Sequence, residues 1–405
     1  MSIKQLRSAA LLLFSVSVVG CADEPTAPPA VSRPAQAVTP FPGELLSTQW
    51  QQLARSLVAA NSPSPVAAGR TYAALSIAQY RAVLAVDGNG GEDGVQPDEG
   101  LGGLGRSQYE RRRGAVSGAS LKVLGFLFPG AASTLERQVQ ADANAGPGNP
   151  HPSFARGLEL GMSAGAAMVD HLKNDGSSVP WQGTIPVGPG YWTANGPPVG
   201  ANLGGVKPYL LNSTAQFRSA PPPQFGSPAF QTDLNEVLTF AQNRTAQQVA
   251  LSLFWAFLGA TPSPLGIWNE LASNYIEDAN LDERAATHVF ALTHAAQFDA
   301  QLGCFESKYF YFYIRPSQAQ PLIPLLFPVP NHPSYPSGHS CISSSAARVL
   351  EHFFPARAAE LANHVTDAGL ARIYPGIHYR FDVNAGRILG TAVADWAISH
   401  EQALR

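Results

Sequence analysis

The segment Tyr335-Pro336-Ser337-Gly338-His339 decides the fold around it, because it ends a loop and begins a helix. The run that follows, through Ala346 to Phe354, has apolar residues at helical spacing. A helix N-terminus presents backbone N–H groups that have no partner within the helix, and a serine there adds a hydroxyl. Gly338 has no side chain, so an anion can approach its backbone closely. The segment therefore predicts an oxyanion cradle.

His339 lies on the first turn of this predicted helix. A plain N-cap would explain Ser337 equally well, but it gives no reason for an imidazole on the first turn. There the ring faces the same anion and can give or take a proton. We therefore predict His339 as a general acid or base.

Two cations precede the cradle: Lys308, and Arg315 followed by Pro316, near the end of a helix predicted over Leu281–Ile314. A spacing of seven places both side chains on one helix face, two turns apart. An arginine can grip two oxygens of a tetrahedral anion, and a lysine adds a point charge. Taken alone, the pair also fits a solvated helix face.

A third element follows the cradle and consists of Arg372, His378 and Asp382, with a turn at Tyr374-Pro375-Gly376. We predict that His378 begins a helix and that Asp382 lies one turn further on the same face. The carboxylate can then hydrogen-bond one ring nitrogen and leave the other free as a nucleophile or ligand. Alone, such a pair also fits a surface contact.

Together, Lys-x6-Arg-Pro, Pro-Ser-Gly-His and Arg-x5-His-x3-Asp resemble the three-part signature of the type 2 phosphatidic acid phosphatase and vanadium haloperoxidase superfamily. The resemblance implies that non-bridging oxygens are bound by Lys308, Arg315, Ser337, Gly338 and Arg372. It also implies that His378 attacks phosphorus or binds vanadium axially, that His339 is the acid or base, and that Asp382 orients His378. Ala371 departs from the family, which often has serine before the arginine.

The stretch around Trp255 and residues 261–269 is similar to the soluble, haloperoxidase-like branch of the superfamily. His332 falls where bromide-oxidising relatives have histidine, although an unremarkable loop histidine fits as well. Phe305 stands where a chloroperoxidase-like enzyme would have tryptophan. Asp299 matches an acidic position of the branch, where it either braces an arginine or caps and solvates its helix. These three residues are our candidates for a halide or supporting site.

The fold class predicted is all-α, a helical bundle of the haloperoxidase and acid phosphatase type with long irregular loops. Two Gly- and Pro-rich insertions, Asp87–Gly105 and about Gly176–Phe230, interrupt the helical pattern and do not support a strand ladder. Loops of that length often border sites, and a packed surface excursion is the alternative. The helices expected around and after the first motif are Ala246–Leu258, Pro264–Ser273, Leu281–Ile314, Ser337–Phe354, Ala356–Ala371 and His378–His400.

The N-terminus predicts export. Lys4 and Arg7 precede a short apolar run that ends in Val18-Val19-Gly20-Cys21, which resembles a bacterial lipoprotein cleavage site with Cys21 lipidated. An ordinary secretory signal or a short uncleaved anchor is the alternative. We divide the chain into a signal peptide (1–21), a flexible tether (22–42), an N-terminal helical region with long loops (43–245) and a helical catalytic region (246–405).

Composition limits the partners. A formal net charge of -3 gives no field that would gather nucleic acid, and the membrane is reached through the lipid anchor only. Cys304 and Cys341 either pair in an exported chain or stay buried thiols. The sequence does not determine the oligomeric state.

The resemblance implies a vanadium-dependent haloperoxidase-like enzyme that binds vanadate and uses hydrogen peroxide to oxidise a halide, with bromide or iodide favoured over chloride. The alternative is an exported acid phosphatase that acts through a phosphohistidine and needs no cofactor. A third hypothesis, from another class, is a non-catalytic oxyanion-binding lipoprotein.

Overall fold

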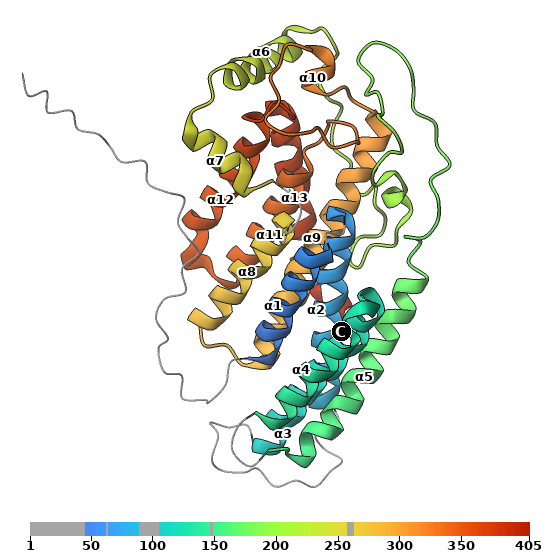
Figure 1. Cartoon of the computed structure of the whole chain (residues 1–405), viewed down its shortest axis with the longest axis vertical. Helices are drawn as coiled ribbons and strands as arrows, with labels where there is room; N and C mark the ends of the chain where they lie inside the picture. The colour runs from blue at the N-terminus through green and yellow to red at the C-terminus, as the bar shows by residue number, and fades with distance from the viewer. Residues whose placement is uncertain (1–44, 62–63, 89–104, 146–148, 257–262) are drawn as a thin grey trace, which may run out of the picture. The chain divides into compact units, whose positions relative to one another are not determined.

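The structure is a computed structural model that describes residues 45–61, 64–88, 105–145, 149–256 and 263–405. Within these ranges the backbone forms thirteen α-helices and four short 3-10 helices, and no β-strand (Figure 1). An isolated bridge joins Tyr191 and Tyr313. The predicted all-α fold is therefore confirmed.

The helices are numbered in chain order. The α-helices are α1 (Leu46–Asn61), α2 (Pro65–Gly88), α3 (Arg106–Leu127), α4 (Ala132–Asn144), α5 (Pro152–Lys173), α6 (Pro228–Gln242), α7 (Ala246–Phe254), α8 (Ser263–Asp278), α9 (Glu283–Tyr311), α10 (Pro316–Ala319), α11 (Gly338–Phe353), α12 (Ala358–Ile373) and α13 (Arg380–Ser399). The 3-10 helices are η1 (Pro129–Ala131), η2 (Ala201–Gly205), η3 (Pro355–Arg357) and η4 (Glu401–Leu404).

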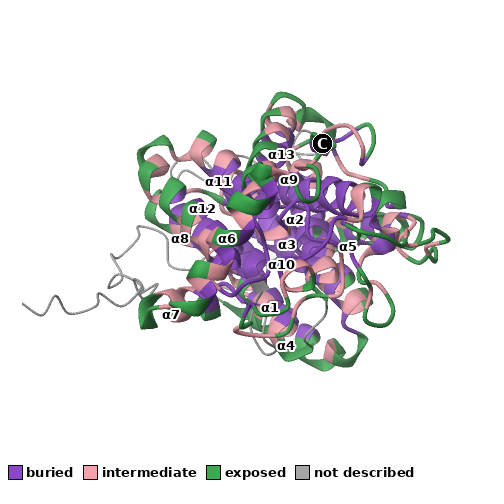
Figure 2. Ribbon diagram, turned by 90° about the horizontal axis from the view of Figure 1, so that it is seen from above, coloured by how far each residue is buried: buried purple, intermediate pink, exposed green. Residues whose placement is uncertain are grey.

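Helix α9 is the central element and packs against α2, α8, α11 and α13. Every residue from 289 to 305 is buried, and Figure 2 shows buried ribbon around α2 and α9. A helix that is buried all round is mostly apolar or small, and α9 is rich in alanine. The polar side chains that it buries include Asp299, which is hydrogen-bonded. Because Lys308 follows in the last turn of this helix, its charge is carried into the interior.

Two apolar clusters meet on α9. The first joins α1, α2, α3 and α5 to Ala291, Leu292 and Ala295 of α9. The second joins α8, α11 and α12 to Val289 and Phe290 of the same helix. The helices that precede the signature therefore support the helices that carry it, through burial of one shared element.

Helices α3 and α5 lie side by side and approach so closely that their backbones touch (Figure 1). A Cβ built on Gly118 of α3 would lie 2.2 Å from the Leu158 carbonyl oxygen, and one on Gly161 of α5 would lie 2.1 Å from the Ala115 carbonyl oxygen. Real Cβ atoms do not approach backbone atoms this closely, so only glycine allows the contact.

Gly118→Ala is therefore expected to lower the free energy of unfolding by about 2 kcal/mol, because the added methyl group forces the two helices apart. Thermal and urea unfolding would measure the loss. Gly125→Ala is the matched control in the same helix, since its Cβ would meet its nearest atom at 3.9 Å. There the better helix propensity of alanine should leave stability equal or slightly higher. Equal melting of both variants at wild-type temperature would contradict the packing argument.

Three helix ends differ from the expectation by three residues or more. α9 ends at Tyr311 rather than Ile314, and α8 continues to Asp278 beyond the predicted Ser273. α7 ends at Phe254, before the predicted Leu258. The insertion predicted over Gly176–Phe230 is irregular as expected, apart from η2 and the start of α6.

Several predictions fall on residues outside the described ranges: the signal peptide 1–21 with Cys21, the tether 22–42, most of the first insertion (89–104), and residues 257–262. Within the described ranges no helix is both long enough and apolar enough to cross a membrane.

Candidate active site

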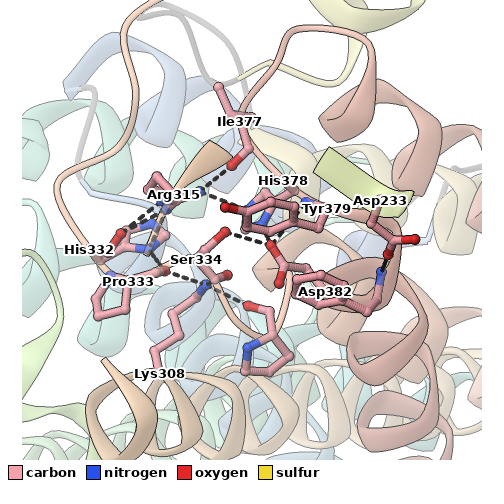
Figure 3. Close-up of polar contacts among 12 residues, drawn as sticks. Asp233, Lys308, Arg315, His332, Pro333, Ser334, Ile377, His378, Tyr379 and Asp382 are labelled. Atoms are coloured by element: carbon pink, nitrogen blue, oxygen red, sulfur yellow. Dashed lines mark hydrogen bonds and ion pairs between the residues drawn. The ribbon is translucent and has the colours of Figure 1, made fainter. Parts of the chain in front are cut away.

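The two predicted cations do not share a helix face. Phe312 takes a left-handed conformation (φ 49°, ψ 37°) that ends α9 after Lys308. The chain then runs extended, and Arg315 is the N-cap of α10, with Pro316 as that helix's first residue. The spacing argument was wrong in this respect, but both side chains are fully buried in the same region (Figure 3).

The Lys308 ammonium contacts three backbone carbonyls. Its Nζ donates to the oxygens of Pro333, Ser334 and Pro336 at 2.9, 2.8 and 2.5 Å (Figure 3). These bonds use all three of its hydrogens. Burial lowers the pKa of Lys308 to about 8. The residue therefore fixes the loop before the cradle and adds positive charge to the site, and it keeps no free donor for an anion in this arrangement.

The cradle has the geometry that the sequence predicts. Ser337 is the N-cap of α11 and its side chain makes no capping bond. Its hydroxyl oxygen is buried without a hydrogen-bond partner in the described residues. A Cβ on Gly338 would meet nothing within 4 Å, so there is open space against this backbone. An unpaired hydroxyl, an open approach and a helix N-terminus together favour an anion.

His339 donates from Nε2 to the carbonyl oxygen of Trp255 at 2.8 Å, since a carbonyl can only accept. This bond places the proton on Nε2 and leaves Nδ1 as the nitrogen available for proton transfer. Burial first, and then the nearby Arg372, hold the pKa of His339 well below its usual value. The ring is therefore neutral until a bound anion offsets the surrounding cations.

The third element is arranged differently from the prediction. α12 ends at Ile373, Gly376 takes a φ of 88°, and α13 begins at Arg380 with Tyr379 as its N-cap. His378 therefore precedes the helix instead of opening it. The predicted contact forms nevertheless, because Asp382 in the first turn of α13 reaches back: His378 Nδ1 lies 2.8 Å from its Oδ2.

The tautomer of His378 follows from Arg315. Nη1 of Arg315 lies 3.1 Å from His378 Nε2 and also donates to the Ile377 carbonyl oxygen at 2.8 Å. A guanidinium has donors only, so Nε2 must accept and carry no proton. Nδ1 then holds the proton and donates it to Asp382. Burial, and then Arg315 and Lys308, keep the pKa of His378 well below its usual value, which agrees with a neutral ring.

Arg372 is the third buried cation. It is 3% exposed, it lies over the Phe327 ring, and its Nη2 donates to the Ser252 carbonyl oxygen at 3.2 Å. Its Nε is buried with no partner in the described part of the chain. Burial, and then repulsion from Arg315, lower its pKa to about 9. A donor left unpaired at this depth costs free energy unless a ligand accepts from it.

Charge at the site is unbalanced. Among the described residues the site contains three buried cations, Lys308, Arg315 and Arg372, and one buried carboxylate, Asp382. Burial raises the pKa of Asp382 to about 6. Burial also lowers the pKa of Arg315 to about 10. An oxyanion would offset the excess positive charge and accept from the unpaired Ser337 hydroxyl and Arg372 Nε. The residues present therefore fit a phosphate or vanadate ion.

The three candidates for a halide or supporting site do not lie together. His332 lies in the site, where its carbonyl oxygen accepts from Arg315 Nε at 3.0 Å and its Nδ1 lies 2.9 Å from Arg315 Nη2. The Phe305 ring packs against it, with centroids 5.1 Å apart. Asp299 lies nine residues before Lys308, which is about 14 Å along a helix.

Asp299 bonds three backbone amides rather than an arginine: the N–H groups of Tyr209, Leu210 and Leu211 at 2.8, 2.7 and 3.0 Å. It neither braces an arginine nor stays solvated, and instead anchors the irregular segment between α5 and α6 to α9. Burial raises its pKa to about 6.

That irregular segment borders a cavity of about 510 Å³ whose walls include Trp181, Asn202, Glu306 and Tyr309. The cavity lies beside α9, and one of its lining residues, Tyr309, directly follows Lys308 in the chain. That the segment rims the active site stays a prediction. Cys304 and Cys341 are free, buried thiols. Cys304 Sγ lies 3.8 Å from the Pro336 carbonyl oxygen, directly behind the cradle loop.

Sequence reasoning missed Ser334 and Ser252. Ser334 donates to Asp382, and Ser252 supplies the carbonyl that holds Arg372. A backbone carbonyl leaves no residue-type signal in a sequence. Ser334 lies three residues before Ser337, and a search for hydroxyls beside the signature could have found it.

These motifs lie in a region that matches a family model and resembles known proteins. Residues 286–404 match the model of the PAP2 superfamily. The chain is 46% identical over 57 residues to a non-specific acid phosphatase of Salmonella typhi, and 44% identical over 57 residues to that of Salmonella typhimurium. Each match covers 14% of this chain and 23% of the relative, so it spans about a quarter of the relatives' length.

Solved structures of similar fold cover far more of the chain. The first bacterial vanadium-dependent iodoperoxidase aligns with a TM-score of 0.72 and 19% identity, over 90% of this chain and 98% of its own. A holo-type bacterial vanadium-dependent chloroperoxidase aligns with a TM-score of 0.64 and 15% identity, over 86% of this chain and 96% of its own. Residues 286–404 thus match the PAP2 superfamily model, and the chain has an all-α fold similar to that of vanadium haloperoxidases.

Proposed function

We propose that this protein is a vanadate-dependent haloperoxidase that oxidises bromide or iodide with hydrogen peroxide. The observation that carries the proposal is a neutral His378 whose unprotonated Nε2 lies among three buried cations and only one carboxylate. Such a pocket suits an anion that bonds to one histidine nitrogen. The extent of the fold match to haloperoxidases, which includes helices before residue 286, supports this branch.

The chain's own residues have separable tasks. Arg372, whose Nε has no partner in the described residues, holds an anion oxygen, and the Ser337 hydroxyl donates to a second position. The N–H groups of Arg315 are all bonded to His332, Ile377 and His378, so Arg315 attracts the anion by its charge. Gly338 leaves the backbone accessible, and Asp382 keeps the proton on His378 Nδ1 so that Nε2 stays a ligand. Vanadate bound there would supply the activation of hydrogen peroxide toward a halide. His339 exchanges protons through Nδ1, since its Nε2 is held by Trp255.

Preference among halides is assigned to His332 and Phe305. His332 Nδ1 accepts from Arg315, and the Phe305 ring packs against the imidazole. Burial, and then Lys308 and Arg315, hold the pKa of His332 well below its usual value, so the ring is neutral. A neutral imidazole and a phenyl ring suit the large, polarisable bromide or iodide better than the strongly hydrated chloride.

A second candidate function is phosphomonoester hydrolysis, and the 46% identity to an acid phosphatase favours it. His378 Nε2 would attack phosphorus, and the departing alkoxide would take a proton from His339. Water would then open the phosphohistidine and release phosphate. This route uses the same pocket and no cofactor. The third candidate is not an enzyme: it is a lipoprotein that only binds an oxyanion.

We also propose that Cys21 is lipidated and holds the catalytic region at the bacterial cell envelope through the tether 22–42. The division into regions 43–245 and 246–405 stays a prediction.

The deciding experiment compares both reactions on one preparation. Protein loaded with vanadate is assayed for bromide- and iodide-dependent oxidation by hydrogen peroxide, and vanadate-free protein for phosphomonoester hydrolysis. Halide oxidation that requires vanadate supports the proposal. Hydrolysis that vanadate inhibits, without halide oxidation, would replace it by the acid phosphatase. Tight vanadate binding with neither reaction would favour the non-catalytic protein.

A further inference from the structure

A hydrogen-bond chain leads from Ser334 through Asp382 to His378 (Figure 3). Ser334 Oγ donates to Asp382 Oδ2 at 2.5 Å, and His378 Nδ1 donates to the same oxygen at 2.8 Å. The Tyr379 backbone N–H donates to it as well, at 3.2 Å. The other oxygen, Oδ1, is buried without a partner in the described residues. One carboxylate oxygen thus accepts three bonds while the second accepts none.

Ser334 is itself held in place by its backbone. Its N–H donates to the Tyr313 carbonyl oxygen at 2.9 Å, and its carbonyl oxygen accepts from Lys308 Nζ at 2.8 Å. The residue is fully buried. Because both backbone groups are bound, the side-chain hydroxyl approaches Asp382 from a fixed point that does not depend on His378.

That independence matters for the carboxylate. Asp382 and His378 alone could turn together, or exchange the two carboxylate oxygens, because Oδ1 has no contact that favours its present place. The Tyr379 N–H also donates to Oδ2, but Tyr379 follows His378 in the chain and moves with it. The Ser334 hydroxyl donates to Oδ2 from outside this segment and so fixes the direction in which the imidazole lies. Groups that orient a histidine ligand or nucleophile in this way commonly change activity by about 10- to 100-fold when they are removed.

We propose that Ser334 is a positioning residue whose hydroxyl locks Asp382 and thereby holds His378 with its proton on Nδ1 and Nε2 directed into the oxyanion pocket. This inference rests on the proposed function only in assigning the chemistry to His378. Ser334 touches neither the pocket space beside Gly338 nor the reacting atoms, and it acts through Asp382.

Ser334→Ala in the full chain removes the hydroxyl and keeps both backbone bonds. Ser334→Thr restores a hydroxyl at the same place. Ser345→Ala is the matched control, because Ser345 is also a fully buried serine, on α11, and its hydroxyl has no partner in the described residues. Ser334→Cys, close to serine in volume and a weaker donor, provides the test if Ser334→Ala does not fold.

Kinetics give the first measurement, on whichever reaction the wild type performs. Ser334→Ala should lower kcat about tenfold with KM nearly unchanged, since Ser334 does not contact substrate. Ser334→Thr should recover most of the rate, and Ser345→Ala should equal wild type. Ser334→Thr as slow as a folded Ser334→Ala would overturn the inference, because the hydroxyl would not be the cause.

Nitrogen NMR of histidine-labelled protein gives the second measurement and needs no turnover. The His378 signals, assigned by their loss in His378→Gln, should show a protonated Nδ1 and an unprotonated Nε2 in wild type. In Ser334→Ala, Asp382 is free to turn and the ring that it held loses its bond to Arg315 Nη1, so the signals should shift towards an average of the two tautomers. Unchanged signals together with an unchanged kcat would refute the role of Ser334. A wild type that catalyses neither reaction would refute the proposed function, while the NMR comparison would still decide this inference.

Discussion

His378→Ala is expected to lower turnover by about 10⁴-fold or more, whichever of the two reactions the protein performs. The substitution removes the only nitrogen that Arg315 and Asp382 together prepare as an unprotonated ligand or nucleophile. The rate under saturating substrate, measured with and without vanadate, checks the prediction. His339 has another task, since its Nε2 is bonded to the Trp255 carbonyl oxygen and its Nδ1 is assigned to proton transfer.

The fold should survive this change, because the apolar clusters on α9 do not include His378. Circular dichroism and thermal melting would establish that the variant is folded. His352→Ala is the matched control: it removes an exposed histidine in the last turn of α11 and should leave turnover at the wild-type level. A folded and active His378→Ala protein would contradict the proposed site.

Arg315→Lys is expected to weaken vanadate or phosphate binding by about 100-fold and to lower turnover by a similar factor. The guanidinium donates at once to the carbonyl oxygens of Ile377 and His332 and to His378 Nε2. A lysine carries three donors on one atom and cannot span these directions. Calorimetric titration with orthovanadate measures the affinity without reference to catalysis.

Arg218→Lys controls for loss of an arginine elsewhere. Arg218 is paired with Glu306 and lies over the Phe310 ring, outside the pocket, so this variant should bind vanadate as the wild type does. If Arg315→Lys binds orthovanadate with unchanged affinity and melts normally, Arg315 only organises the loop and the anion site lies elsewhere.

Local sequence determined the elements of the site that depend on neighbours along the chain. The cradle at Ser337-Gly338 forms because a loop meets a helix N-terminus, and this geometry is set within a few residues. The pairing of His378 with Asp382 forms because the two lie four residues apart, even though the helix begins only at Arg380. The helical class followed from apolar periodicity, and residues 286–404 were recognisable from the spacing of the motifs.

The places where prediction was wrong depend on distant contacts. Phe312 in a left-handed conformation is locally unfavourable, so no propensity predicts that α9 ends there. The Trp192 N–H donates to the Phe312 carbonyl oxygen at 2.7 Å and so stabilises this conformation. Arg315 therefore lies beyond the end of α9. Asp299 likewise finds its partners in Tyr209–Leu211, about 90 residues away in the chain, where spacing carries no information.

Sequence alone therefore predicted which residue types gather at the candidate site, because charge, hydroxyls and helix termini are properties of single residues and short segments. The tertiary structure alone decided which atoms face the pocket. The tautomer of His378 depends on Arg315, which lies 63 residues earlier, and the role of Ser334 depends on Asp382, which lies 48 residues later. Hydrogen bonds are directional and short, so such assignments exist only after the chain has brought both partners within about 3 Å.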